Sequence, residues 1–234
     1  MKNTLRSLII LSLLLLCDQI TASVAEDYQW FEDSFLSGRL SYEELLESAD
    51  NFRADDSNDS QVIAAGLYIL AGDYQVGYFK DREAGSLHYS EAAEVTRDLE
   101  SGTSLGANFL IDAKIRNLIG GNIISFIKAG IELTNLMNSA IESYPDDPRT
   151  RFQLAMKTLN APALFGGDIP KGQAMINEII KDPETSTPLK FSIYQGMAFF
   201  WYQKKDLRKS DLYWEAAQRI YPDSWMLPPE DRLQ

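Results

Sequence analysis

The chain has 234 residues, of which 45% are hydrophobic and 24% charged, the composition of a folded globular protein rather than a disordered or fibrous one. Its 22 Lys and Arg residues are outnumbered by 34 Asp and Glu, and the net charge of −12 excludes a surface that binds nucleic acid or anionic lipid by bulk attraction. Because there is a single cysteine, no internal disulfide forms, and the fold must depend on its hydrophobic core.

The first 25 residues have the three parts of a secretory signal peptide. Two basic residues precede an apolar run over residues 8–17, which is too short to cross a bilayer as a helix. Ser23 and Ala25 supply the small side chains that export cleavage needs, so we expect the mature chain to begin at Glu26. The sequence therefore predicts an exported protein, periplasmic or secreted.

A second interpretation of the same region is lipid attachment at Cys17. The preceding leucines resemble a bacterial lipobox, but the residue just before the cysteine should be small and here it is Leu16. Lipidation at Cys17 would make the protein a membrane-anchored lipoprotein and is the minor alternative.

No later segment has the length of a membrane span. The most apolar one, residues 107–127, is interrupted by the charged residues Asp112, Lys114 and Arg116. We therefore expect no integral membrane span in the mature chain.

Helix start signals punctuate the rest of the chain. Ser41 is followed three residues later by Glu44, the spacing of a capping box. The pairs Asp147–Pro148 and Thr187–Pro188 each place a side-chain acceptor at the cap and a proline at the first helical position. These signals predict helices that begin immediately after turns.

Apolar periodicity predicts helices throughout and no strands. Apolar residues recur every three or four positions in segments 133–141 and 172–180, and alternation of period two is sustained nowhere. About ten helices are expected, over residues 28–36, 41–53, 60–77, 83–100, 104–119, 122–143, 148–160, 169–181, 188–203 and 207–220. The predicted fold class is all-α.

The last helix pair has the most specific pattern. Its first helix carries Tyr194, Met197, Ala198 and Trp201, and Ser210, Trp214, Ala217 and Pro222 lie on and after its second. The order and spacing of these aromatic, small and proline residues resemble those of a tetratricopeptide repeat. We predict that Trp201 and Trp214 are core residues of this pair, and that Asp206 caps its second helix.

Weaker copies of the second-helix half occur at Leu133, Met137, Ala140 and Pro145, and at Gly85, Tyr89 and Ala92. The resemblance implies a right-handed solenoid of antiparallel helix pairs over residues 61–234, preceded by a helical segment, residues 26–60, that does not align.

An insertion of about five residues interrupts the repeat around residues 160–168. An insertion with Gly-Gly-Asp before a second helix also makes the chain similar to the helical T component of some bacterial tripartite periplasmic transporters. We expect an exposed loop, with Asp168 capping the next helix. Leu164 and Phe165 either pack back into the groove or meet a partner, and packing is the expected outcome.

Candidate chemistry is sparse. Ser104 lies in a G-x-S-x-G pattern, which in a nucleophile elbow needs a strand before the serine and a histidine after it in the chain. Here a helical segment precedes Ser104, and the single histidine, His88, comes before it. We interpret Ser104 as a helix cap and His88 as a packing side chain. No metal site or cofactor motif is found, and no enzyme activity is expected.

Two functions fit these observations. The favoured one is binding of a peptide or partner protein on a helical-repeat surface, without catalysis. The alternative is an accessory of a periplasmic transport system that binds a small apolar ligand within the bundle. Candidate contact residues are Leu164, Phe165, Tyr194 and Phe199, with Trp201 as further cavity lining. A cavity along the bundle axis would favour the ligand, and an open polar-rimmed groove the peptide.

Overall fold

The computed structural model describes residues 24–97, 103–118 and 123–228, with the side chains of residues 123–129 and 165 outside the description. Within these ranges the chain is all-α, with ten α-helices and no strand, which confirms the predicted fold class. The helices are an N-terminal helix over residues 24–36, α2 (Tyr42–Arg53), α3 (Asn58–Tyr74), α4 (Arg82–Arg97), α5 (Ser104–Leu118), α6 (Ile123–Ser143), α7 (Pro148–Asn160), α8 (Ile169–Lys181), α9 (Thr187–Gln203) and α10 (Leu207–Ile220). Across the described ranges, none of them is both long enough and apolar enough to span a membrane.

Most of the predicted caps form. The capping box of Ser41 and Glu44 is complete, and Asp147, Asp168 and Asp206 each accept a hydrogen bond from a backbone N–H in the first turn of α7, α8 and α10. These side chains satisfy donors that a helix start leaves unpaired.

Two predicted caps are wrong by one residue. Ser186, not Thr187, caps α9 by accepting from the N–H of Leu189, so Pro188 is the second helical residue. Likewise the Thr103 hydroxyl accepts from the N–H of Gly106, which leaves Ser104 as the first residue of α5. In both places two neighbouring hydroxyl residues could cap, and the helix begins one position away from the residue predicted.

The helix predicted over residues 60–77 has a different end. After Tyr74 the chain continues as a five-residue π-helix, Gln75–Phe79, which ends at Lys80 in the left-handed region with φ 62°. The wider turn stacks Tyr78 on Tyr74, with ring centroids 5.0 Å apart. Such a turn has no apolar period of its own, so periodicity could not predict it.

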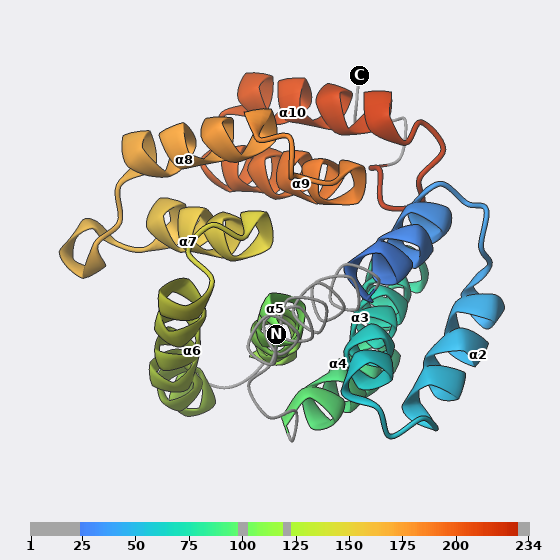
Figure 1. Ribbon diagram of the computed structural model, residues 1–234. Coiled ribbons are helices and arrows are strands. Elements are labelled where there is room, and N and C mark those ends of the chain that lie inside the picture. The colour runs from blue at the N-terminus through green and yellow to red at the C-terminus, as the bar shows by residue number, and fades with distance from the viewer. Residues whose placement is uncertain (1–23, 98–102, 119–122, 229–234) are drawn as a thin grey trace, which may run out of the picture.

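The helices follow one another around the molecule, and each one packs against its neighbours in the chain (Figure 1). The most extensive contacts are those of α3 with α4 and of α9 with α10, followed by α2 with α3. The N-terminal helix, α3, α5, α7 and α9 line a central cavity, and among the described residues the intervening helices contribute no lining to it. This alternation is what a stack of helix pairs predicts, while the right-handed solenoid stays a prediction.

Small residues allow the helices of a hairpin to approach closely. A Cβ added to Gly72 on α3 would overlap the Tyr89 ring of α4, and one added to Gly172 on α8 would lie 2.6 Å from Leu159 Cγ of α7. In the last pair, the Ser210 hydroxyl donates to the Ala198 carbonyl at 3.0 Å. The small positions of the repeat pattern therefore lie at helix contacts.

The two ends of the described chain meet, as Figure 1 shows beside α3. Leu36 of the N-terminal helix is buried in one cluster with Phe191, Ala198, Trp214, Ala217 and Tyr221 of the last helix pair and the turn that follows it. The Tyr221 hydroxyl also bonds Asp33. Residues 26–60, which did not align with the repeat, thus contribute a helix that packs against the last helix pair. The helices from this one to α10 therefore form a closed ring, and we use that name for them below.

Candidate functional site: a charged central cavity

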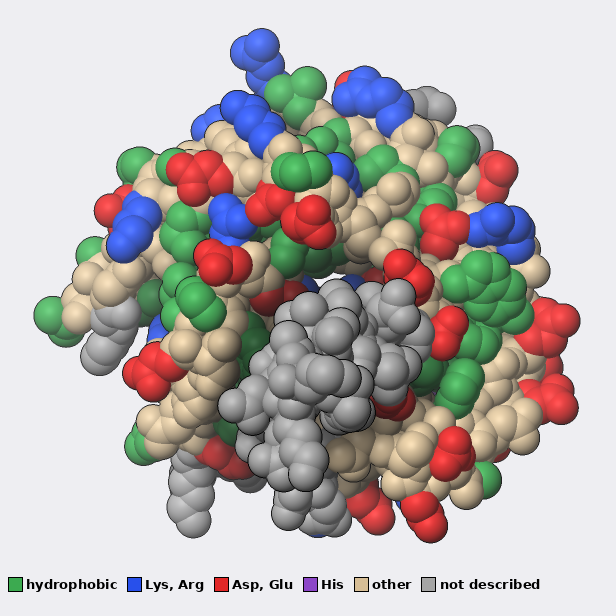
Figure 2. Space-filling view, viewed as in Figure 1, with side chains coloured by type: hydrophobic (Ala, Val, Ile, Leu, Met, Phe, Trp, Pro, Cys, Tyr) green, Lys and Arg blue, Asp and Glu red, His purple; other side chains and the backbone are tan. Residues whose placement is uncertain are grey.

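A cavity of about 290 Å³ lies at the centre of the ring, where the space-filling view is hollowed and charged side chains gather (Figure 2). Its lining comes from five helices and the C-terminal turn. On each helix the lining residues follow the i, i+3, i+4 and i+7 pattern or part of it, so they share one face. They include Tyr28, Glu32 and Leu36; Ile69, Leu70 and Asp73; Phe109, Asp112 and Arg116; Arg149, Phe152, Gln153 and Met156; Leu189, Ser192, Gln195, Gly196 and Phe199; and Met226.

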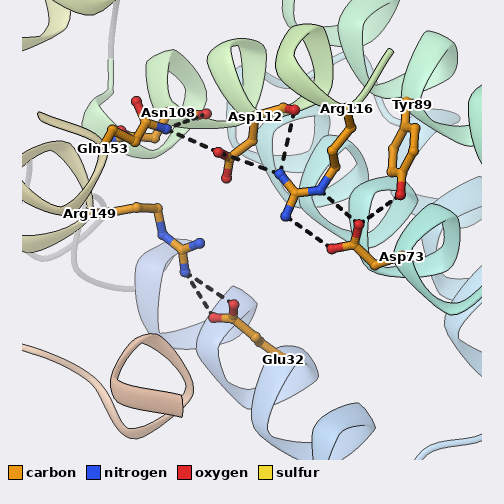
Figure 3. Close-up of polar contacts among 8 residues, drawn as sticks. All are labelled: Glu32, Asp73, Tyr89, Asn108, Asp112, Arg116, Arg149 and Gln153. Carbon is orange, nitrogen blue, oxygen red and sulfur yellow. Dashed lines mark hydrogen bonds and ion pairs between the residues drawn. The ribbon is translucent and has the colours of Figure 1, made fainter. Parts of the chain in front are cut away.

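One group of charged side chains centres on Arg116 (Figure 3). Its Nε donates to Asp73 Oδ1 at 2.7 Å and its Nη2 to Asp73 Oδ2 at 3.0 Å, a bidentate pair. The Tyr89 hydroxyl donates to the same Asp73 at 2.8 Å. Asp112, one helical turn before Arg116, is a weaker partner at 3.5 Å from Nη1.

Burial alone would lower the pKa of Arg116, but the Asp73 and Asp112 carboxylates raise it above its ordinary value. Burial raises the pKa of Tyr89, and the Asp73 charge raises it further. Arg116 therefore stays charged and Tyr89 stays a neutral hydrogen-bond donor at any ordinary pH.

A second pair joins α7 to the N-terminal helix. Arg149 Nη2 donates to Glu32 Oε2 at 2.9 Å and to Oε1 at 3.2 Å, and the side chains are only 15% and 4% exposed. The guanidinium also lies 5.6 Å from the ring centroids of Tyr28 and Phe109, which form a cation–π cage. Arg149 is thus fixed by both charge and aromatic packing.

Burial raises the pKa of the Glu32 carboxyl, and the neighbouring Arg149 only partly offsets that effect. Burial would lower the pKa of Arg149, but the nearby Glu32 carboxylate raises it above its ordinary value. Burial also raises the pKa of the Tyr28 hydroxyl. At neutral pH the cavity holds two fixed cations, and Glu32 is the acid whose charge is most costly to bury.

Gln153 joins the Arg116 group to α7. Its Nε2 donates to Asp112 Oδ1 and to the Asn108 carbonyl, each at 3.2 Å. Asn108 in turn donates to Thr150 Oγ1 at 2.8 Å and to the cap residue Asp147 at 3.2 Å. The Arg116 group therefore extends as one hydrogen-bond network across α5 and α7, which a helix cap supports from behind, and the Arg149–Glu32 pair stands beside it.

Some hydrogen-bonding capacity on this wall remains open among the described residues. Arg149 uses only Nη2, so its Nε and Nη1 groups have no acceptor there. Asp112 accepts through Oδ1 alone, so its Oδ2 has no donor there. Figure 3 shows the Arg149 guanidinium and the Asp112 carboxylate on neighbouring sides of the same space. These groups are partly accessible, so water or a ligand in the cavity can pair with them.

A larger cavity, of about 420 Å³, lies between α3, α4, α5 and α6. Small apolar and hydroxyl side chains make up most of its lining. Its two charged residues, Asp59 and Arg97, are half-buried and exposed, respectively. It has no network of buried charged groups comparable with that of the central cavity, which is therefore the better candidate site.

The structure does not bring the predicted contact residues together. Phe199 lines the central cavity while remaining 55% exposed, and its ring packs edge-on against Trp214 at 5.1 Å. Tyr194 is half-buried between α9 and α10, near Tyr213, and does not line the cavity. Trp201 does not line it either, because it is buried in the core of α7, α8 and α9.

Trp201 and Trp214 are both 7% exposed, which confirms that they are core residues. His88 also packs as expected, since its Nε2 lies 2.9 Å from the Tyr42 hydroxyl and its ring stacks on Tyr68.

The insertion is a folded loop with a short 3₁₀-helix, Ala163–Phe165. Leu164 is 89% exposed, so the expectation that it packs back into the groove is wrong. The side chain of Phe165 lies outside the described residues. Gly167 and Asp168 donate backbone hydrogen bonds to Pro162 and Thr158, and this pairing holds the loop away from the groove.

Sequence reasoning missed the charged residues of the cavity, Glu32, Asp73, Asp112, Arg116 and Arg149, as site residues. A signal was available for two of them, because Asp112 and Arg116 interrupt the most apolar segment one helical turn apart. Charges on one face of an apolar helix indicate buried partners rather than a solvated surface.

The chain matches no family model, no curated protein and no solved structure.

Proposed function

We propose that this chain is a non-catalytic binding protein that holds a small ligand in the central cavity. The observation that supports this most strongly is the open hydrogen-bonding capacity of Arg149 and Asp112 inside a cavity walled by five helices. A cavity on the axis of the ring is the feature that favours a small ligand over an extended peptide. Its polar wall departs from the small apolar ligand that the sequence analysis gave as the alternative to a peptide.

The chemistry of the wall supports binding rather than catalysis. Asp73 and Glu32 are each held by an arginine, and the described lining contains no histidine, cysteine or lysine that could act as a base or nucleophile beside them. Fixed charges in a cavity of limited volume are suited to orient a ligand. The alternation of lining and outer helices also supports our proposal of a tetratricopeptide-type architecture. We propose that a chain of this architecture with a ligand cavity serves as an accessory in transport.

The proposal is tested by closing the cavity without altering its charges. Ser192→Phe on α9 places a ring in the cavity, and Ser90→Phe on the exposed face of α4 is the matched control. The parent, both variants and any bound small molecules are compared by native mass spectrometry after identical purification from the native organism. We expect a molecule bound to the parent and the control but absent from Ser192→Phe. The proposal fails if no molecule is bound, or if Ser192→Phe retains it.

Binding of a partner protein on the outer surface is a second candidate. It is favoured by Tyr78 and Phe79, which are each 57% exposed at the π-helical turn with ring centroids 5.2 Å apart. Exposed neighbouring aromatics are typical of protein contact sites. Replacing both with Ser should abolish the capture of a specific partner without lowering the melting temperature. Unchanged capture would exclude this surface.

A further inference from the structure

The charges of the central cavity are unequal. Three carboxylates, Glu32, Asp73 and Asp112, face two guanidinium groups, those of Arg116 and Arg149. Asp73 takes two nitrogens of Arg116, and Glu32 takes one nitrogen of Arg149. Asp112 is left with the longest ion pair of the three, at 3.5 Å. Asp112 is therefore the carboxylate with the most charge to share with a ligand.

Arg149 is the complementary group. A guanidinium presents five N–H donors in a planar fork, and here only Nη2 has an acceptor among the described residues. The Cδ atom lies between its unused Nε–H and Nη1–H groups, so a ligand carboxylate accepts a charge-assisted hydrogen bond from one of these groups and not from both in parallel. The aromatic rings of Tyr28 and Phe109 hold this guanidinium in place.

A ligand with a single charge would satisfy only half of this wall. An anion on Arg149 alone would add a fourth negative charge beside Glu32 and Asp112, a costly addition where little water screens it. A cation on Asp112 alone would leave the free N–H groups of Arg149 without an acceptor. A molecule with one group of each sign supplies both partners and leaves the cavity charge unchanged.

The remaining lining is apolar. Phe152, Met156, Leu189 and Phe199, on α7 and α9, border the same cavity. A hydrocarbon group packed there would be removed from water, while the charged wall holds the polar end. The volume of about 290 Å³ is at the lower end of the range for small-molecule sites.

We propose that the ligand is a small zwitterion of the amino-acid class, with its carboxylate on a free N–H group of Arg149, its ammonium on Asp112 and an apolar side chain against α7 and α9. This inference depends on the proposed function, because it names the ligand of the same cavity. It differs from it in specifying two charges of opposite sign on one molecule.

The test uses two matched sets of probes against the purified full chain, with binding measured by calorimetry. Phenylalanine is compared with 3-phenylpropanoate, which lacks the ammonium, and with 2-phenylethylamine, which lacks the carboxylate. Leucine is compared with 4-methylpentanoate and 3-methylbutylamine. At least one amino acid should bind, and both of its single-charge analogues should bind about tenfold more weakly or worse, since each loses a buried charge pair.

Two variants assign the contacts. Asp112→Asn keeps an oxygen for Gln153 but removes the charge, so it should weaken amino-acid binding about tenfold and reduce the advantage of the amino acid over its carboxylate analogue. Arg149→Lys keeps a cation near Glu32 but loses the free guanidinium N–H groups, so it should reduce the advantage of the amino acid over its amine analogue. Asp182→Asn, which removes an ion pair with Arg151 outside the cavity, is the control and should bind as the parent does.

The inference is overturned if neither amino acid binds, if an analogue binds as tightly as its amino acid, or if Asp112→Asn binds like the control. If the native small molecule is lost from Ser192→Phe but any of these results is also obtained, the proposed function stands and only the zwitterion is refuted. Amino-acid binding that persists in Ser192→Phe would instead contradict the cavity as the binding site.

Discussion

Glu32 makes the stability of the fold depend on pH. Its carboxyl is 4% exposed beside Arg149, and burial raises its pKa above the ordinary value of 4.5. The folded protein therefore holds this proton more tightly than the unfolded chain does. The stability that results is fully present below 4.5 and is lost as the pH rises through the folded-state pKa.

Glu32→Gln isolates this effect, because glutamine resembles the protonated acid and does not titrate. We expect the free energy of unfolding of the parent, minus that of the variant, to be largest near about pH 4 and to fall towards about pH 7. Each pH unit between 4.5 and the folded-state pKa lowers the difference by about 1.4 kcal/mol. Urea unfolding at a series of pH values measures it. A difference that grew with pH would mean that Arg149 stabilises the carboxylate more than burial destabilises it.

At the scale of one helix contact, Gly72 fixes the distance between α3 and α4. A Cβ at this position would overlap the Tyr89 ring, whose hydroxyl is held by Asp73 at the cavity wall. Gly72→Ala should therefore lower the free energy of unfolding by about 1–3 kcal/mol, the usual cost of overpacking. The measurement is chemical denaturation.

Gly130→Ala on α6 is the matched control, because nothing lies within 4 Å of its added Cβ. Alanine has the higher helix propensity, so this variant should be stabilised by about 0.5–1 kcal/mol. Equal effects at the two glycines would mean that α3 and α4 are not in close contact at Gly72.

The last hairpin offers a further test at the element scale. Trp214 on α10 is buried against the edge of Phe199 on α9, and both residues lie between the cavity and the outer surface. Trp214→Ala should cost about 3–5 kcal/mol, as aromatic truncations in a core do. Thermal unfolding measures it, and a variant that melts with the parent would contradict the burial of this side chain.

Element by element, the sequence predicted the helices well because their signals are local. Capping at Ser41 and Asp147 depends on residues three positions apart, and an amphipathic face repeats within two turns. The cap at Ser186 was not predicted because the neighbouring Thr187 could serve equally well. The π-helix after Tyr74 was not predicted because packing on a distant aromatic, Trp225, decides the local geometry.

The cavity could be predicted much less well, because its charges come from four helices far apart in the chain. Glu32 and Arg149 are 117 positions apart, and nothing local to either one indicates the other. Only Asp112 and Arg116, on one helix, left a visible trace as charges in an apolar segment. The apolar contact residue Leu164 was chosen by composition, and the pairing of the loop backbone placed it in solvent instead.

For the molecule as a whole, closure of the ring gives the cavity a complete wall. The N-terminal helix contributes Tyr28 and Glu32 to that wall, and it is held against the C-terminal turn by a few contacts. Among these, the half-buried Trp225 packs on Phe35 at 5.5 Å and on Tyr74 at 4.8 Å between ring centroids. The closure thus depends on side chains from the two ends of the described chain.

Trp225→Ala should therefore do more than lower overall stability by about 3 kcal/mol. Because it removes the contact that holds residues 24–36 in place, the amides of this helix should lose protection in hydrogen exchange before those of α7 and α8, which have a core of their own. Trp30→Ala, on the same helix but 57% exposed, is the control and should leave both properties close to those of the parent. Uniform loss of protection in Trp225→Ala would mean that the ring opens as one cooperative unit, and unchanged protection of residues 24–36 would show that Trp225 does not close it.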